Sequence, residues 1–276
     1  MAGGAVVGLT RLVPDPEHPG AYFVRMDGID HSWIDPDDPT RLEFDYMQRI
    51  ADVIDAHAPE GERLRVLHIG GAGMTLARYV AATRPTSAQV VLEPDQALTD
   101  EVRSAVPLPK NFGIKVRAID GRAGVAAIRD GWDADVVILD AFADASVPAE
   151  LTTVEFFADL RRILGPDGVI LLNLTDSSPF TYTRRVLAGV CEVFPERLLS
   201  AEPATLRGRR FGNILVAGSA LALPTAALAR AAARSVFPYR VLHGHQLARF
   251  GSGAVPFTDA TAQPSPEPPG GRTFFR

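Results

Sequence analysis

The chain has 276 residues, of which 46% are hydrophobic, and its formal net charge is −5. This length allows one large α/β domain with a small appendage, and the hydrophobic content excludes a wholly disordered chain. The acidic balance argues against nucleic acid or an anionic membrane as a partner, and a single cysteine excludes a disulfide framework or a cysteine-rich zinc site.

These features predict a cytoplasmic protein, because a reducing compartment suits a chain with one cysteine. No apolar run reaches the roughly 18 residues that a membrane-spanning helix needs. Residues 1–20 lack a basic segment ahead of an apolar one, so we interpret them as a flexible lead rather than a signal peptide.

The first predicted element is a small β hairpin within residues 21–34, AYFVRMDGIDHSWI, where Asp27-Gly28 is a favourable turn. An amphipathic helix follows over residues 41–57, and Thr40 is placed to cap it. Residues 21–60 therefore form a small N-terminal β element with a linking helix.

From residue 64 onward, short apolar runs alternate with helical patterns, which is typical of a doubly wound, mostly parallel sheet. Helices are expected near residues 75–82, 94–106, 122–129, 149–164 and 180–194. The predicted strands are LRVLHI (64–69), AQVVLE (88–93), GIKVRAI (113–119), ADVVILD (134–140), GVILLNL (168–174), ERLLSA (196–201) and NILVAGS (213–219). The last two follow each other closely and predict an antiparallel edge.

An alanine-rich helix is expected after Leu223, and the composition then shifts to proline, glycine and small polar residues. Such a segment buries too little apolar area to order itself, so residues 252–276 are predicted to be disordered. We expect the Rossmann-like domain to cover residues 61–235 and a C-terminal extension to cover 236–276. His68 and Cys191 are predicted to be core residues.

Four predicted strands end in residues that suit a nucleotide. Gly70, Gly71 and Gly73 follow the first strand of the alternation, where a glycine turn lets backbone N–H groups approach a ligand. Acids follow the next three strands in turn. Glu93 is placed to accept both ribose hydroxyls of an adenosine group, and Asp120 in AIDGRAG to accept the adenine amino group. Asp140 ends ADVVILD at the same edge of the sheet. The alternative is a purely structural α/β domain.

These motifs resemble those of the spermidine synthase-like aminopropyltransferases. LHIGGAGMTLARYV is similar to their glycine loop, VVLEPD to their ribose acid, and AIDGRAG, with Asp120 and Gly121, to their adenine site. DADVVILDAF resembles their catalytic strand, and MDGIDHSW and LEFDYMQRI resemble their N-terminal domain. The resemblance implies a class I S-adenosylmethionine-type domain of seven strands with the last antiparallel, usually a homodimer, that moves an aminopropyl group from decarboxylated S-adenosylmethionine to putrescine.

The chain departs from the family pattern around the polyamine. The glycine loop GGAGMT lacks the family's acid, and Ala143 stands at the second catalytic acid, with Asp144 one residue late. His31 replaces a glutamine, Met47 replaces the amide beside Tyr46, and Leu206 stands where a tyrosine is expected.

Asp140 is the best candidate for a general base, because an amine acceptor is protonated near neutral pH and must lose a proton. Asp144 is the second candidate base. Candidate acceptor contacts are His31, Tyr46, Asp176, Arg207 and Arg210. Each has a structural alternative: hairpin packing for His31, interdomain packing for Tyr46, capping of the next helix for Asp176, and a solvated turn for the arginines. We expect no metal at His243 and His245.

Three hypotheses follow. The first is methyl or other alkyl transfer from intact S-adenosylmethionine to a non-polyamine small-molecule acceptor, since an acid-free glycine loop tolerates the methionine carboxylate. The second is a genuine aminopropyltransferase in which Asp140 and Asp144 suffice. The third is a catalytically silent nucleotide-binding or dimerisation module. The product nucleoside would be S-adenosylhomocysteine in the first case and methylthioadenosine in the second.

Overall fold

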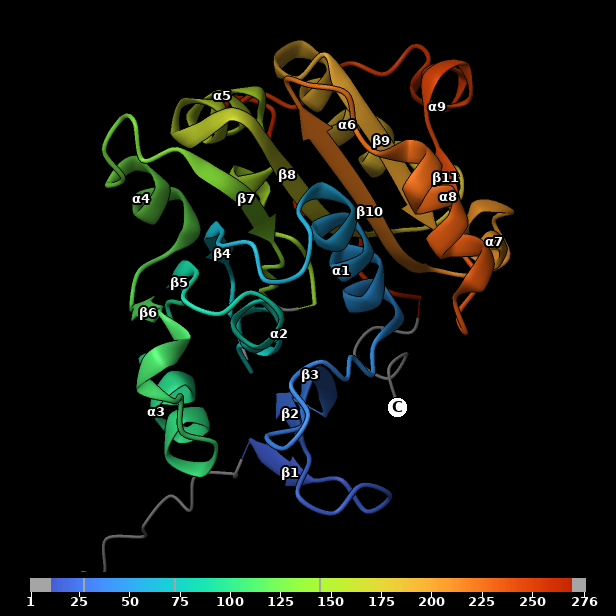
Figure 1. Cartoon of the computed structure of the whole chain (residues 1–276). Helices are drawn as coiled ribbons and strands as arrows, with labels where there is room; N and C mark the ends of the chain where they lie inside the picture. Colours follow the sequence, from blue (N-terminus) through green and yellow to red (C-terminus); the bar gives the residue numbers. More distant parts are fainter. Residues whose placement is uncertain (1–10, 27, 72, 144, 270–276) are drawn as a thin grey trace, which may run out of the picture.

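A central sheet of eight strands organises the molecule, and a small three-stranded sheet lies at the carboxyl edge of its parallel strands (Figure 1). This computed structural model describes residues 11–26, 28–71, 73–143 and 145–269. The strand order is β11-β9-β10-β8-β7-β4-β5-β6; the pairs from β8 to β6 are parallel, and β10 is antiparallel to both β8 and β9. The predicted doubly wound, mostly parallel sheet is confirmed. Its eighth strand, β11, was not expected, and it pairs with β9.

The elements follow the predicted alternation of strands and helices. The strands of the central sheet are β4 (Arg65–Ile69), β5 (Ala88–Leu92), β6 (Ile114–Arg117), β7 (Ala134–Leu139), β8 (Leu164–Asp176), β9 (Glu196–Ala201), β10 (Gly212–Ser219) and β11 (Arg240–Leu242). The helices are α1 (Asp45–His57), α2 (Thr75–Thr83), α3 (Gln96–Ala105), α4 (Gly121–Ala126), α5 (Val154–Ile163), α6 (Thr181–Val193), α7 (Pro203–Leu206), α8 (Thr225–Arg234) and α9 (Gly244–Gly251).

Both faces of the sheet are covered, which explains why its central strands are apolar without interruption. On β8, Ile170 and Leu172 pack in the cluster that contains α5 and α6, whereas Val169 and Leu171 pack on the side of α1 and α8. Figure 1 shows α1 and α8 in front of the sheet with α5 and α6 behind it. This two-sided burial leaves the strand ends as the place where polar side chains gather.

The N-terminal sheet consists of β1 (Leu12–Pro14), β2 (Tyr22–Met26) and β3 (Ile29–Ile34). β1 pairs with β2, so residues 12–14 are a strand and not part of a flexible lead, whereas residues 1–10 lie outside the described residues. The linking helix begins at Asp45 rather than at residue 41. Thr40 does not cap it, because its hydroxyl donates to Asp38, and Phe44 occupies the N-cap position.

Residues 252–276 were predicted to be disordered, but residues 252–269, the part that the structure describes, pack against the domain. Phe257 is 1% exposed, its carbonyl accepts from Val154 N (2.9 Å), and Arg185 lies over its ring. Asp259 pairs with Arg122 at 2.7 Å, and Ser265 is buried beside Val147. A few anchors on α4, α5 and α6 thus order a segment whose composition alone predicts disorder.

Two smaller expectations concern the core. His68 is buried and bonds Gln89 at 2.9 Å, and burial lowers the pKa of its imidazole to about 4, so it is a neutral core residue as predicted. Cys191 was expected in the core as well, but its side chain is exposed, because it lies on the outer side of α6.

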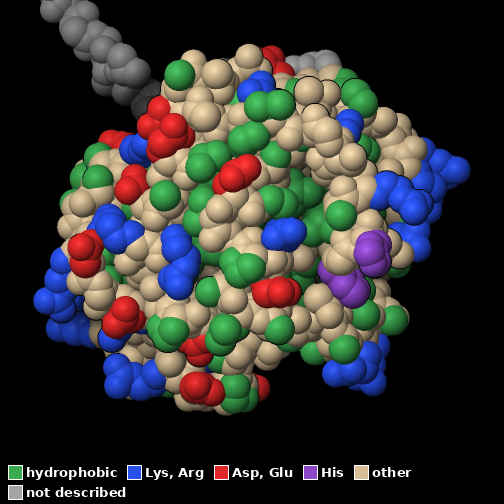
Figure 2. Space-filling view, turned by 90° about the horizontal axis from the view of Figure 1, so that it is seen from above, with side chains coloured by type: hydrophobic (Ala, Val, Ile, Leu, Met, Phe, Trp, Pro, Cys, Tyr) green, Lys and Arg blue, Asp and Glu red, His purple; other side chains and the backbone are tan. Residues whose placement is uncertain are grey.

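The face opposite the small sheet shows acidic and basic side chains interspersed with apolar ones, with basic groups gathered at two edges (Figure 2). In the part of the chain that the structure describes, no helix is long and apolar enough to cross a membrane. Among the same residues, no group of three or more potential metal ligands comes together.

Candidate functional site

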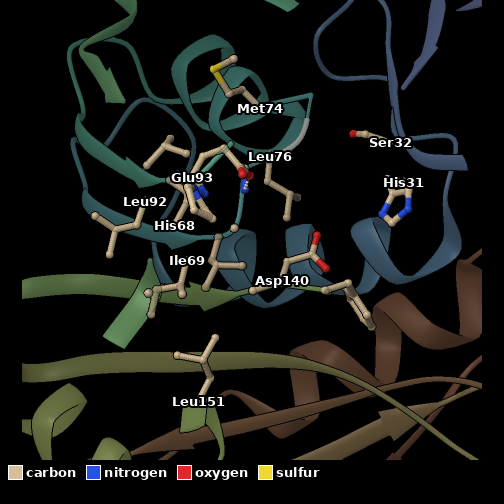
Figure 3. A pocket seen from close by; sticks show the side chains of 18 of the residues that line it. His31, Ser32, His68, Ile69, Met74, Leu76, Leu92, Glu93, Asp140 and Leu151 are labelled. Carbon is tan, nitrogen blue, oxygen red and sulfur yellow. Dashed lines mark hydrogen bonds between the residues drawn. The ribbon is translucent and has the colours of Figure 1, made fainter. Parts of the chain in front are cut away.

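Two cavities meet at the carboxyl edge of the parallel strands. The first cavity has a volume of about 260 Å³ and is lined mainly by the segments that follow β4, β5, β6 and β7. The second cavity, of about 360 Å³, lies toward α1 and β10 and shares His31, Tyr46 and Phe142 with the first. Figure 3 shows Glu93 and Asp140 pointing into the first cavity from two strand ends, with His31 approaching from the N-terminal sheet.

The glycine turn after β4 owes its residues to close packing. Gly70 has a φ of +86°, and a Cβ there would lie 2.2 Å from the carbonyl oxygen of Asp140. A Cβ on Gly71 would lie 2.4 Å from the side chain of Val91. Only glycine therefore lets the ends of β4, β5 and β7 come together, and both glycines line the first cavity as predicted.

Glu93 organises this turn from the end of β5. Its carboxylate accepts from Gly71 N and from Asp95 N, both at 3.0 Å. A carboxylate has about four acceptor positions, and ribose hydroxyls are among the donors that it can accept. Position and chemistry both fit the ribose role predicted for Glu93.

Gly73 has a different role from the one predicted. It does not line either cavity, and a Cβ there would lie 2.9 Å from Ile34 Cδ1 and Ser32 Oγ of β3. Close by, Ser32 and Thr75 share a hydrogen bond of 2.8 Å, and Thr75 donates to the carbonyl of Trp33. Gly73 thus allows the N-terminal sheet to rest on α2.

Asp120 and Gly121 line the first cavity at the start of α4. Asp120 caps this helix by accepting from Ala123 N at 2.8 Å. A Cβ on Gly121 would lie 2.4 Å from Ile69 Cγ2, so the glycine lets α4 approach β4. The predicted adenine residues therefore lie beside Glu93 in one cavity.

Asp140 lies where the two cavities meet, and its carboxylate is held from both sides. Asn173 Nδ2 donates to it at 2.8 Å, and the Tyr46 hydroxyl donates at 3.3 Å. Burial raises the pKa of Asp140 to about 6, and these two hydrogen bonds oppose that rise. Burial and the nearby Asp140 charge raise the pKa of Tyr46, so its phenol stays protonated and remains a donor. Asp140 is thus a carboxylate that titrates close to neutral pH.

An amide chain behind Asp140 was missed in the sequence analysis. Asn213 Nδ2 on β10 donates to Asn173 Oδ1 on β8 at 3.1 Å, and the buried Arg49 donates to the carbonyl of Asn213. The available signal was Asn173 itself, a single amide in the apolar run GVILLNL. A buried polar side chain in a central strand needs partners, and Asp140 is one of them.

The second cavity combines aromatic walls with an amide and hydroxyl floor. Phe44, Tyr46, Phe142 and Phe237 supply the rings. Asn173, Thr175 and Asn213 supply the polar floor. Carboxylates also line it, among them Asp30, which binds Arg25 at 2.6 Å. A site of this kind suits an aliphatic molecule with a polar end near Asp140.

Three predicted acceptor contacts, Asp176, Arg207 and Arg210, are not brought into either cavity. Asp176 is a capping residue, because it accepts from Ser177 N (2.7 Å) and Thr183 N (2.9 Å) near the start of α6. Arg207 is exposed and Arg210 pairs with Glu202, and neither lines a cavity. Asp144 lies outside the described residues.

This geometry can be compared with known proteins. No family model matches the chain. The crystal structure of a probable spermidine synthase from Corynebacterium glutamicum is 32% identical in sequence and covers 90% of this chain; 92% of its own chain is covered, with a TM-score of 0.83. The chain belongs to the spermidine synthase-like family.

Curated relatives agree with this assignment. The polyamine aminopropyltransferase of Chromobacterium violaceum is 26% identical over 188 residues, which are 67% of each protein. The probable polyamine aminopropyl transferase of Bifidobacterium longum is 33% identical over 108 residues; these are 39% of this chain and only 23% of that relative. The predicted resemblance is confirmed at the level of family and fold.

Three of the departures from the spermidine synthase-like pattern lie around the junction of the cavities, whereas Leu206 lines neither cavity. Met47 and Ala143 line the first cavity, and His31 lines both. Asp140 and Tyr46, which the chain retains, lie in direct contact there. The retained pair therefore occupies the centre of the site and the replaced residues surround it.

Proposed function

We propose that the chain transfers an aminopropyl group from decarboxylated S-adenosylmethionine to a primary amine. The observation that carries this proposal is the position of Asp140, a carboxylate with a pKa of about 6 at the point where an adenosine-type cavity meets an aromatic cavity. The names of its relatives, aminopropyltransferases and a probable spermidine synthase, support the same reaction.

The first cavity suits the nucleoside. Glu93 would bind the ribose hydroxyls and Asp120 the adenine amino group, while Gly70 and Gly71 leave room for the ligand beside the ends of β4 and β5. When bound, the sulfonium supplies an electrophilic carbon and a neutral thioether leaving group. The second cavity would then hold the acceptor with its reactive nitrogen beside Asp140.

The residues around Asp140 would prepare the acceptor. A primary amine has a pKa of about 10.4 and arrives as an ammonium ion, so it needs a base. Asp140 takes one proton, and the neutral nitrogen then attacks the carbon bound to sulfur. A C–N bond forms as the C–S bond breaks, and the electron pair stays on sulfur. The product is a secondary ammonium and methylthioadenosine. Tyr46 and Asn173 would hold Asp140 in line for this transfer.

The first of the three hypotheses, methyl transfer to a non-polyamine acceptor, is not supported by the comparisons, because the curated relatives are named for aminopropyl transfer. Neither Arg207 nor Arg210 lines the second cavity, so these two cations do not favour a carboxylate or phosphate acceptor over an amine there. The absence of an acid in GGAGMT remains a departure from the family. The donor must therefore be tested directly.

The test is a product assay with both donors. The chain is incubated with decarboxylated or intact S-adenosylmethionine and with putrescine, 1,3-diaminopropane or cadaverine, and methylthioadenosine and S-adenosylhomocysteine are quantified. We expect amine-dependent methylthioadenosine from the decarboxylated donor only. S-adenosylhomocysteine as the main product, or nucleoside binding without turnover of any amine, would overturn the proposal. Size-exclusion chromatography with light scattering tests the expected homodimer separately.

A further inference from the structure

Phe237 is an aromatic residue at the rim of the second cavity. It lies in the segment between α8 and β11, far along the chain from the other rings of the cavity, and 46% of its surface is exposed. A large apolar side chain left this exposed beside a cavity indicates a surface that a ligand covers.

The segment that carries Phe237 is held at both ends. Ser235 Oγ donates to the carbonyl of Phe237 (2.8 Å) and accepts from its N–H (3.2 Å). Tyr239 is buried, and its hydroxyl donates to Asp52 of α1 at 2.6 Å. The exposed side chain of Phe237 therefore belongs to a turn that Tyr239 anchors to α1.

The rest of the cavity is built to receive an aliphatic chain. Phe44 and Tyr46 lie with ring centroids 6.0 Å apart at the start of α1, and Phe142 follows β7. Asn173 lines this cavity and donates to Asp140 of the first cavity, so the reactive nitrogen belongs beside this pair under the proposed function. An acceptor that points its amine at Asp140 extends its methylene groups outward between these rings.

We propose that Phe237 determines acceptor specificity by covering the hydrocarbon chain of the amine. This inference rests on the proposed function, and it adds that the C-terminal extension supplies one wall of the acceptor site. The ring then contributes in proportion to the number of methylene groups that it covers, because apolar contact scales with buried area.

Val236 provides a matched control. It is the next residue in the chain and 86% exposed, but it does not line the second cavity. It lines another hollow, together with Thr40 and Asp52, whereas Phe237 lines both that hollow and the second cavity. A change at either position alters an exposed apolar side chain of the same turn, and only one of them faces the acceptor.

The experiment measures methylthioadenosine formation at saturating decarboxylated S-adenosylmethionine for diamines of three, four and five carbons. We expect Phe237→Ala to raise the acceptor KM by roughly tenfold for the acceptor that the wild type prefers, the range of one or two lost apolar contacts. The rise should be largest for the longest diamine. Phe237→Leu, which keeps apolar area, should recover most of the loss. Val236→Ala should stay within about twofold, and KM for the nucleoside should not change.

The outcomes separate the two proposals. An active wild type whose acceptor KM is unchanged in Phe237→Ala, or changed equally in Val236→Ala, overturns the role of Phe237 alone. A loss independent of chain length also overturns it. A wild type that forms no methylthioadenosine with any amine removes the proposed function together with this inference. Thermal unfolding of each variant verifies folding, and Phe237→Leu keeps the test decisive if Phe237→Ala is unstable.

Discussion

The first cavity is walled mostly by residues 68–77 and 91–151, with a small contribution from the N-terminal sheet, whereas the second cavity draws on β3, α1, β8, β10 and Phe237. In the first, Gly70, Glu93 and Asp140 each directly follow the strand that positions them. In the second, residues more than 200 positions apart face one another. The fold therefore positions the first cavity mainly by local geometry and the second by the packing of distant segments. Under the proposed function, substitutions in the two cavities should separate in their effects on nucleoside and acceptor.

Asp140→Asn tests the carboxylate that lines the first cavity and bonds Tyr46 and Asn173 of the second, and it should have the largest effect. Loss of a general base lowers kcat by about 10²- to 10⁴-fold. Nucleoside affinity should change little, because Glu93 and Asp120 remain. The measurement is kcat by methylthioadenosine formation alongside calorimetry of nucleoside binding. A variant that keeps more than about a tenth of the wild-type kcat would show that Asp140 is not the base.

The same variant has a predicted effect on stability that depends on pH. The pKa of Asp140 is raised to about 6 in the folded protein, so the folded state disfavours the charged form. This lowers the free energy of unfolding of the wild type. The loss is absent below the unfolded-state pKa of about 3.9 and complete above pH 6, where it is about 3 kcal/mol, since one pKa unit corresponds to 1.36 kcal/mol. Asp140→Asn should therefore be more stable than the wild type at pH 8 and equal to it near pH 4, as measured by chemical denaturation. Wild-type kcat/KM should fall as the pH drops through about 6.

The sequence predicted the first cavity well for a physical reason. Apolar runs mark buried strands, and the residue after each run falls at the same edge of a parallel sheet, so Gly70, Glu93, Asp120 and Asp140 could be placed without knowing any contact. Gly73 could not be placed in this way, because it packs against the N-terminal sheet and does not line the cavity.

The second cavity was predicted poorly because its contacts depend on the pairing register of β10 with β8 and on a few specific contacts of the C-terminal segment. The pairing that brings Asn213 against Asn173 requires the register of β10 on β8, which a run of apolar letters does not encode. Ser265 and Phe257 lie in a stretch rich in proline and glycine, where composition favours disorder and a few specific contacts decide otherwise. For Asp176 the sequence left open both capping and contact with the acceptor, and its two backbone donors show that it caps.

A change at Glu93 should affect the first cavity alone and rank second in size. Glu93→Ala removes the acceptor of Gly71 N and of the ribose hydroxyls, and hydrogen bonds to a charged group contribute about 1.5–3 kcal/mol each. Nucleoside affinity should fall by roughly 10- to 100-fold in calorimetry, while KM for the acceptor at saturating nucleoside stays within about twofold. Asp100→Asn, an exposed acid of α3, serves as the matched control. Unchanged nucleoside binding in Glu93→Ala would show that the first cavity does not hold the ribose there.

Ser265→Ala should have the smallest effect and should fall on the acceptor half alone. Ser265 Oγ accepts from Val147 N (2.9 Å) and lies 3.3 Å from the hydroxyl of Thr175, a residue of the cavity floor. Without the hydroxyl, the backbone after Phe142 loses a buried partner, at a cost of about 1–3 kcal/mol in stability. We expect a severalfold rise in KM for the amine with nucleoside affinity unchanged, since Thr175 lines the second cavity and not the first.

Thr261→Ala is the control for Ser265→Ala, because Thr261 lies in the same C-terminal segment and its hydroxyl bonds Thr258 at the surface. Steady-state kinetics with each substrate varied in turn, together with thermal unfolding, separates the two roles of this segment. A segment that only stabilises the fold would lower the melting temperature in Ser265→Ala and leave both KM values alone. A selective rise in the amine KM, absent in Thr261→Ala, would instead show that Ser265 of the C-terminal extension supports the floor of the acceptor cavity through Thr175.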